Sequence, residues 1–193
     1  MAELRAHTEL PTKYGELTLN IFKTNTFEEL MVITNFDGTG DINLRMHSAC
    51  ATSELFGSLK CDCSEQLNST LDYIATHGGI LVYLPQEGRG IGITNKIKAY
   101  KLQEEGLDTV EANEALGLDQ DLRNYDDVVE ILNFYGITTV QLITNNPLKI
   151  SALEDQGIYI TQRIPSIHES NPHSANYLKT KGAKMGHFDL DGE

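Results

Sequence analysis

The hydrophobic pattern of the chain changes its period near residue 64, and this change constrains the fold more than any other feature. Before it, three short runs are rich in β-branched and aromatic residues: ELTLNIFKT (16–24), ELMVITNF (29–36) and INLRMHS (42–48). Turn signals such as KYG and DGTGD separate the runs, as expected for strands. Helical and strand patterns alternate after Ser64. Strands followed by alternating helices and strands predict an α+β (mixed α/β) fold around a mixed sheet.

The second part of the chain gives the order of its elements. Leu67, Leu71 and Ile74 are spaced as on one face of a helix, with Ser64 as a possible N-cap and Gly78-Gly79 as its end. A strand over 79–86 and a helix within 90–106 follow; the helix carries Ile93, Ile97 and Tyr100 on one face. We further expect a helix marked by Val128, Ile131, Leu132 and Tyr135, a strand over 138–145, a helix over 147–157 that starts at Pro147, and a last strand over 158–165.

The chain has 193 residues without an internal repeat, a low-complexity tract or a long linker. This length suffices for one hydrophobic core without disulfides. We therefore expect a single domain over 1–193, whose polar end, roughly 168–193, is flexible.

The composition argues against two classes of partner. The net charge of −13 disfavours general binding to a nucleic acid polymer or to an anionic membrane. No apolar run reaches about 18 residues, and the first residues lack a secretory signal pattern. We expect a cytoplasmic protein whose anionic ligands are met by local basic residues. Such residues stand in or beside motif-like stretches: Arg45, Lys60, Arg89, Lys96, Arg123 and Lys149.

All three cysteines lie within fourteen residues, with the spacing C-x10-C-x-C: Cys50, Cys61 and Cys63. In a reducing compartment this cluster points to a metal or to thiol chemistry before disulfides. Cys61 and Cys63 can share one ion only if the chain turns between them. Three thiolates suit zinc, and a zinc site with three protein ligands keeps a position for water, whose pKa falls to roughly 7. The alternatives are three inert buried cysteines, or a structural site with His47 as fourth ligand.

Two segments near the cysteines could bind an anion or line the same cavity. PQEGRGIG (85–92) joins a strand to a helix, so its backbone N–H groups and Arg89 could meet a phosphate; a plain turn would use the same glycines. In LRMHS, Arg45 and His47 share one face of a strand by alternation.

Two later segments have both a functional and a structural interpretation. LDQDLRNYDD (118–127) places Asp121 and Arg123 before a helix, where an acidic helix start is the alternative. TNNPLK (144–149) places Thr144 and Lys149 where a strand gives way to a helix, and the alternative is simple capping.

Three segments together resemble one family, GTP cyclohydrolase II, in its stand-alone form. They are HSACATSELFGSLKCDC, QEGRGIGITNKIKAYKLQEEGLDTVEAN and LITNNPLK, in this order, and the resemblance extends from LPTKYGE to TKGAKMGH. It implies zinc-dependent opening of the imidazole ring of GTP, with release of formate and pyrophosphate. The product would be 2,5-diamino-6-(5-phosphoribosylamino)pyrimidin-4(3H)-one, in the first step of riboflavin biosynthesis.

The resemblance also implies residue roles. Cys50, Cys61 and Cys63 would hold zinc, Asp121 would accept a proton, and Arg123 would be the nucleophile toward the α-phosphate. Tyr100 would lie near the ring-opening centre. The expected GTP contacts are Arg45, Met46, His47, Ser48, Ala49, Gln66, Glu87, Gly88, Arg89, Thr109, Thr144 and Lys149. Magnesium on the triphosphate and a homodimer are further implications.

Two positions depart from the family pattern: Ala49 replaces an acidic residue before the first cysteine, and Gly90 stands where a larger polar residue can occur. Two other functions fit the same sequence. One is a paralogue that opens GTP but keeps the formyl group or the pyrophosphate. The other is a non-catalytic nucleotide sensor whose zinc only holds the fold.

Overall fold

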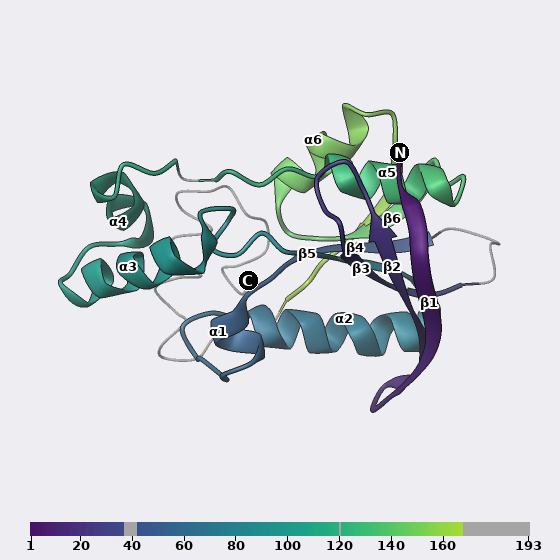
Figure 1. Cartoon of the computed structure of the whole chain (residues 1–193), viewed down its shortest axis with the longest axis horizontal. Helices are drawn as coiled ribbons and strands as arrows, with labels where there is room; N and C mark the ends of the chain where they lie inside the picture. Colours follow the sequence, from purple (N-terminus) through teal and green to yellow (C-terminus); the bar gives the residue numbers. More distant parts are fainter. Residues whose placement is uncertain (37–41, 120, 168–193) are drawn as a thin grey trace. The chain divides into compact units, whose positions relative to one another are not determined.

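The computed structural model describes residues 1–36, 42–119 and 121–167 (Figure 1). Contacts between residues divide the chain into two compact units. Unit 1 contains Met1–His47, Glu65–Leu84 and Tyr125–Ser166, and unit 2 contains Ser48–Ser64 and Pro85–Asn124. The single-domain expectation stays a prediction, and the expected flexible end at 168–193 lies outside the described residues.

A seven-stranded mixed sheet organises unit 1 within the described ranges. Its strand order is β1-β2-β3-β5-β4-β6-β7. The strands are β1 (Glu3–Thr12), β2 (Gly15–Lys23), β3 (Leu30–Asn35), β4 (Ile42–Ser48), β5 (Gly79–Leu84), β6 (Thr139–Ile143) and β7 (Tyr159–Ile164). Neighbours from β1 to β5 pair antiparallel, whereas β4–β6 and β6–β7 pair parallel. The mixed α/β fold class is therefore confirmed.

The sequence predicted every strand of this sheet except β1. That strand is exposed along nearly its whole length and lacks an alternation of apolar residues. Its pairing with β2, which begins where Thr12 faces Gly15, holds it in place. A strand that forms by backbone pairing alone leaves little side-chain signal in the sequence.

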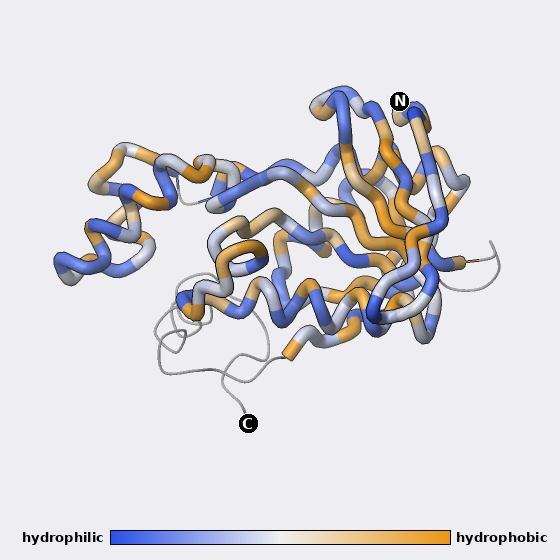
Figure 2. The backbone as a smooth tube through the Cα atoms, turned by 60° about the horizontal axis from the view of Figure 1, so that its bottom comes forward, coloured by the Kyte–Doolittle hydropathy of each residue, from blue (hydrophilic) through white to orange (hydrophobic). Residues whose placement is uncertain are grey.

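Helices cover both faces of the sheet in unit 1 (Figure 1). On one face lies α2 (Cys63–His77), whose Ile74 packs with Leu17 and Leu81. On the other lie α5 (Asp126–Phe134) and α6 (Pro147–Glu154). Their fully buried side chains join those of the central strands in one core: Phe22, Leu44, Leu84, Ile131, Leu132, Leu142 and Leu153. The central strands are accordingly hydrophobic in Figure 2, and each such side chain contributes about 1.5–3 kcal/mol by burial.

The glycine pair predicted to end α2 does so. The N–H of Gly78 donates to the carbonyl oxygen of Ile74 at 2.9 Å, with Gly78 at φ +77. Gly79 has φ +141, and a Cβ there would lie 2.3 Å from the carbonyl oxygen of Asn43. The start of the helix differs from the prediction, because α2 begins at Cys63 and Ser64 therefore lies in its first turn.

Unit 2 contains α1 (Ala51–Glu54), α3 (Gly92–Glu104) and α4 (Thr109–Ala115), and α3 contacts α4. The predicted α3 is present, but Ile93 and Ile97 are 44% and 48% exposed, and its buried residues are Lys96 and Ala99. In the described part of the chain, no helix is both long enough and apolar enough for a membrane span.

The sequence analysis missed α4, whose acidic segment resembles solvated surface. The side chain of Asp108 accepts hydrogen bonds from the first turn of α4, and the side chain of Glu111 accepts one from the backbone N–H of Asp108. This is a capping box, and the pattern D-x-x-E is its sequence signal.

Candidate functional site

The three cysteines come together in unit 2. Their Sγ atoms all lie within 4.8 Å of one another, and those of Cys50 and Cys61 are 3.6 Å apart. Cys50 precedes α1 and Cys63 opens α2, so the chain turns between Cys61 and Cys63 as expected. Tetrahedral zinc with bonds of about 2.3 Å to sulfur separates its ligands by about 3.8 Å. The donor set and its spacing therefore fit zinc.

The cysteine cluster has three members among the described residues that could ligate a metal. His47, considered as a fourth ligand from the sequence, belongs to unit 1, where its ring stacks on Tyr83 with centroids 5.8 Å apart. Hydrogen bonds from Cys61, Cys63 and Lys96 outweigh burial and hold the pKa of Cys50 far below its usual value. The bond to Cys50 in turn raises the pKa of Cys61. A thiolate is the form that binds metals, so the lowered pKa of Cys50 favours a metal site over three inert thiols.

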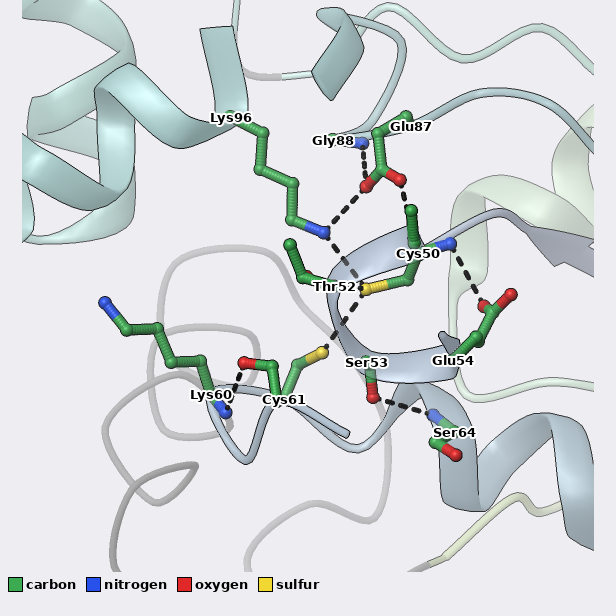
Figure 3. A network of polar contacts seen from close by, with 12 residues as sticks. Cys50, Thr52, Ser53, Glu54, Lys60, Cys61, Ser64, Glu87, Gly88 and Lys96 are labelled. Atoms are coloured by element: carbon green, nitrogen blue, oxygen red, sulfur yellow. Dashed lines mark hydrogen bonds and ion pairs between the residues drawn. The ribbon is translucent and has the colours of Figure 1, made fainter. Parts of the chain in front are cut away.

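Cys50 lies within a polar network that links it to Cys61 on one side and to Lys96 and Glu87 on the other (Figure 3). The Nζ atom of Lys96 donates to Cys50 Sγ at 3.0 Å and to Glu87 Oε1 at 2.6 Å. The other carboxylate oxygen of Glu87 accepts from the N–H of Ala51 at 2.7 Å. Burial alone would lower the pKa of Lys96, but the contacts with Glu87 and Cys50 raise it. The sequence analysis counted Lys96 among the local basic residues but did not place it with the cysteines, because no spacing along the chain relates it to Cys50 or Glu87.

The segment 85–92 is a tight loop that uses several of its own N–H groups. The N–H of Gly88 donates to the Glu87 side chain. The N–H of Gly90 donates to the carbonyl oxygens of Gln86 and Glu87, and the N–H of Gly92 donates to the Glu87 carbonyl oxygen. Arg89 has φ +64, a conformation that is uncommon for a non-glycine residue. A Cβ at Gly90, which has φ +90, would lie 3.0 Å from Leu122 Cβ, so a larger residue there would be strained.

Asp121 and Arg123 form a forked ion pair in unit 2. The Nε of Arg123 donates to Asp121 Oδ1 at 2.9 Å, and Nη2 donates to Oδ2 at 2.5 Å. Burial raises the pKa of Asp121, but the bonds and charge of Arg123 outweigh burial and lower it. Helix α5 begins at Asp126, so Asp121 is not part of an acidic helix start.

A second group of expected site residues gathers in unit 1, at the carboxyl ends of β4 and β6. Arg45 Nη1 donates to the Ile143 carbonyl oxygen at 3.0 Å and Nη2 to Gln66 Oε1 at 2.5 Å. Lys149 Nζ donates to the Met46 carbonyl oxygen at 2.6 Å. Arg45 and Lys149 are only 4% and 6% exposed. Carboxyl ends of neighbouring parallel strands are common ligand sites in sheets with parallel strands.

The remaining expected residues have simpler surroundings. Thr144 Oγ1 accepts from the N–H of Asn146, and Asn146 caps α6, which agrees with the capping interpretation of that segment. Tyr100 lies on α3 with Lys60 Nζ 4.5 Å from its ring centre, and burial raises its pKa to about 12. Thr109 opens α4.

The expected site residues thus divide between the units. Unit 1 holds Arg45, Met46, His47, Gln66, Thr144 and Lys149. Unit 2 holds Ser48, Ala49, Cys50, Cys61, Cys63, Glu87, Gly88, Arg89, Tyr100, Thr109, Asp121 and Arg123.

Comparisons with known proteins agree on one family. The family model for GTP cyclohydrolase II matches residues 3–165. The riboflavin biosynthesis protein RibBA of Staphylococcus saprophyticus is 48% identical over 187 residues, which cover 96% of this chain and 48% of that protein. The protein of the same name from Staphylococcus epidermidis is 47% identical over 186 residues, covering 96% and 47%. This chain therefore spans about half the length of these relatives.

One solved structure is also similar at low sequence identity. It is RibBX from A. baumannii, described as a two domain 3,4-dihydroxy-2-butanone 4-phosphate synthase. The TM-score is 0.49 at 15% identity, with 84% of this chain and 40% of that chain covered.

Proposed function

Because this chain belongs to the GTP cyclohydrolase II family, we propose that it hydrolyses GTP and opens its imidazole ring. Formate and pyrophosphate leave, and the product is 2,5-diamino-6-(5-phosphoribosylamino)pyrimidin-4(3H)-one. The relatives are named riboflavin biosynthesis proteins, which supports a place in that pathway.

The observation that carries this proposal is the cluster of Cys50, Cys61 and Cys63, which has three members among the described residues. Catalytic zinc sites typically have three protein ligands, whereas structural sites have four. Zinc held by these three thiolates would supply Lewis-acid activation of a water molecule.

Asp121 and Arg123 have complementary roles in this proposal. Asp121 accepts a proton during ring opening. Arg123 donates to both carboxylate oxygens of Asp121, and these bonds make Asp121 a weaker base than a free carboxylate. A phosphate that draws the guanidinium away would restore that basicity. The resemblance makes Arg123 a nucleophile, but a guanidinium keeps its proton to a pH above about 12, so a charged fork on the α-phosphate is the role that its chemistry supports.

Basic residues neutralise the triphosphate in an acidic protein with a net charge of −13. Arg45 and Lys149 contribute buried positive charge in unit 1, and Arg89 contributes a fork in unit 2. Magnesium on the triphosphate completes this neutralisation. The further proposed GTP contacts are Met46, His47, Ser48, Ala49, Gln66, Glu87, Gly88, Thr109 and Thr144, with Tyr100 beside the ring-opening centre. We further propose a homodimer, which sedimentation equilibrium tests by mass.

The direct test is a mass spectrum of the products after the zinc-loaded protein is incubated with GTP and magnesium. The proposed reaction gives the diaminopyrimidinone monophosphate, free formate and pyrophosphate. A formylated or triphosphorylated product would instead identify a paralogue with a different endpoint, and unchanged GTP would contradict the proposed activity.

Two further measurements separate a catalytic ion from a structural one. Cys61→Ser should abolish formate release and leave part of the GTP affinity. The control is Leu59→Ser, which changes an exposed side chain two residues away. Chelation should remove activity while the melting transition remains. Unfolding upon chelation would favour a structural zinc site.

A further inference from the structure

Lys96 is buried in a way that requires partners. It is 8% exposed on α3, and a buried ammonium group is costly unless it is paired and hydrogen-bonded. Glu87 and Cys50 meet this requirement, at 2.6 and 3.0 Å from Nζ. The ammonium group also lies 5.7 Å from the ring centre of Tyr100, within the range of a cation–π contact. Lys96 thus connects a carboxylate, a thiol group and an aromatic ring.

Glu87 is committed to the protein on both carboxylate oxygens. Oε1 accepts from Lys96 and from the N–H of Gly88 at 3.2 Å, and Oε2 accepts from the N–H of Ala51. A carboxylate offers about four acceptor positions, so three of them are in use. Ala51 follows Cys50 directly, and Glu87 therefore fixes the backbone beside the sulfur that Lys96 contacts (Figure 3).

The Lys96 ammonium group complements the charge that the cysteine cluster would carry with a metal ion. Three thiolates with a divalent ion carry one net negative charge, and the Lys96 ammonium group offsets it. Partners of metal ligands orient those ligands and tune their affinity, and their removal typically lowers metal affinity about 10- to 100-fold. The sulfur that Lys96 contacts is that of Cys50, at 3.0 Å from Nζ.

We propose that Lys96, held by Glu87, is a positioning residue for the metal centre. It fixes the Cys50 sulfur and balances the charge of the three thiolates. This inference rests on the proposed metal site and adds to it a role for Lys96 and for the Glu87 carboxylate that holds Lys96.

The test uses the full chain, stripped of metal and titrated with Co²⁺ in competition with a chelator. The absorption from thiolate-to-cobalt charge transfer reports both the affinity and the environment of the sulfurs. Lys96→Met should lower the affinity about 10- to 100-fold and shift this band. Lys101→Met is the matched control, because it removes an exposed lysine that pairs with Glu104 on the same helix, and it should leave both unchanged.

The outcomes separate this inference from the proposed function. A Lys96→Met protein with wild-type affinity and an unshifted band would overturn the role of Lys96, since a merely structural lysine would not move the spectrum. Where Lys96→Met fails to fold, Lys96→Gln, which keeps a neutral donor, decides by the same two readouts. A wild-type protein without a thiolate-to-cobalt band would overturn both the metal site and the inference.

Discussion

Replacing Glu87 with methionine should destabilise the protein more than replacing Lys96 with methionine. Both side chains are largely buried, and Glu87→Met removes the acceptor oxygens of three donors: the N–H groups of Ala51 and Gly88, and the Lys96 ammonium group, which keeps only its contact with Cys50. Removal of one partner of a buried ion pair typically costs about 3–5 kcal/mol. Lys96→Met leaves the carboxylate with two N–H donors, so its cost should be closer to that of one lost hydrogen bond, about 1–3 kcal/mol.

The assay is urea unfolding followed by circular dichroism, with reductant and chelator present so that no metal contributes. The double variant Glu87→Met/Lys96→Met should be less destabilised than Glu87→Met alone, because the buried ammonium group that lost its carboxylate is then absent as well. Lys101→Met, which breaks an exposed pair, should change the unfolding free energy by at most about 1 kcal/mol. Additive costs of the two single changes, or a Glu87→Met cost below about 1 kcal/mol, would refute the coupling.

Two more predictions concern backbone geometry and pH. Gly79→Ala should lower the melting temperature well beyond Gly57→Ala, because a Cβ at Gly79 would lie 2.3 Å from the Asn43 carbonyl oxygen, whereas Gly57, also at positive φ, has nothing within 4 Å. Equal melting temperatures would show that this clash relaxes freely. Arg123→Met should lose stability at neutral pH, because Arg123 lowers the pKa of Asp121 in the folded state. The stabilisation of the folded state by the Arg123–Asp121 pair is fully present above the pKa of Asp121 in the unfolded chain, about 3.9. It disappears as the pH falls through the lower pKa of Asp121 in the folded protein. Urea unfolding at neutral and acidic pH measures it, and a difference that persists unchanged into acid would contradict it.

Much of the fold could be predicted from short-range pattern. The spacing of Leu67, Leu71 and Ile74 identified α2, and Gly78 marked its end because a positive φ closes a helix there. Pro147 marked the start of α6 in the same local way. Strand β1 and the buried face of α3 could not be predicted from local pattern, because both depend on the segments that pair with them or pack against them in the folded chain.

The candidate site also combines features that local sequence predicts with features that only the folded chain shows. The clustering of three cysteines and the turn between Cys61 and Cys63 are local, and the sequence alone indicated a metal centre from them. The sequence also determined the family, because its motifs occur in order along the chain.

Only the tertiary structure decided which charges meet. Lys96 lies 46 residues from Cys50 and nine from Glu87, and no periodicity relates them. The same holds for Arg45 with the Ile143 carbonyl oxygen, and for Lys149 with that of Met46. Buried polar groups pair because their desolvation is costly, and the partner is whichever group the folded backbone brings within hydrogen-bond distance. Local pattern determines the elements, whereas these long-range pairings arise only when the elements have packed.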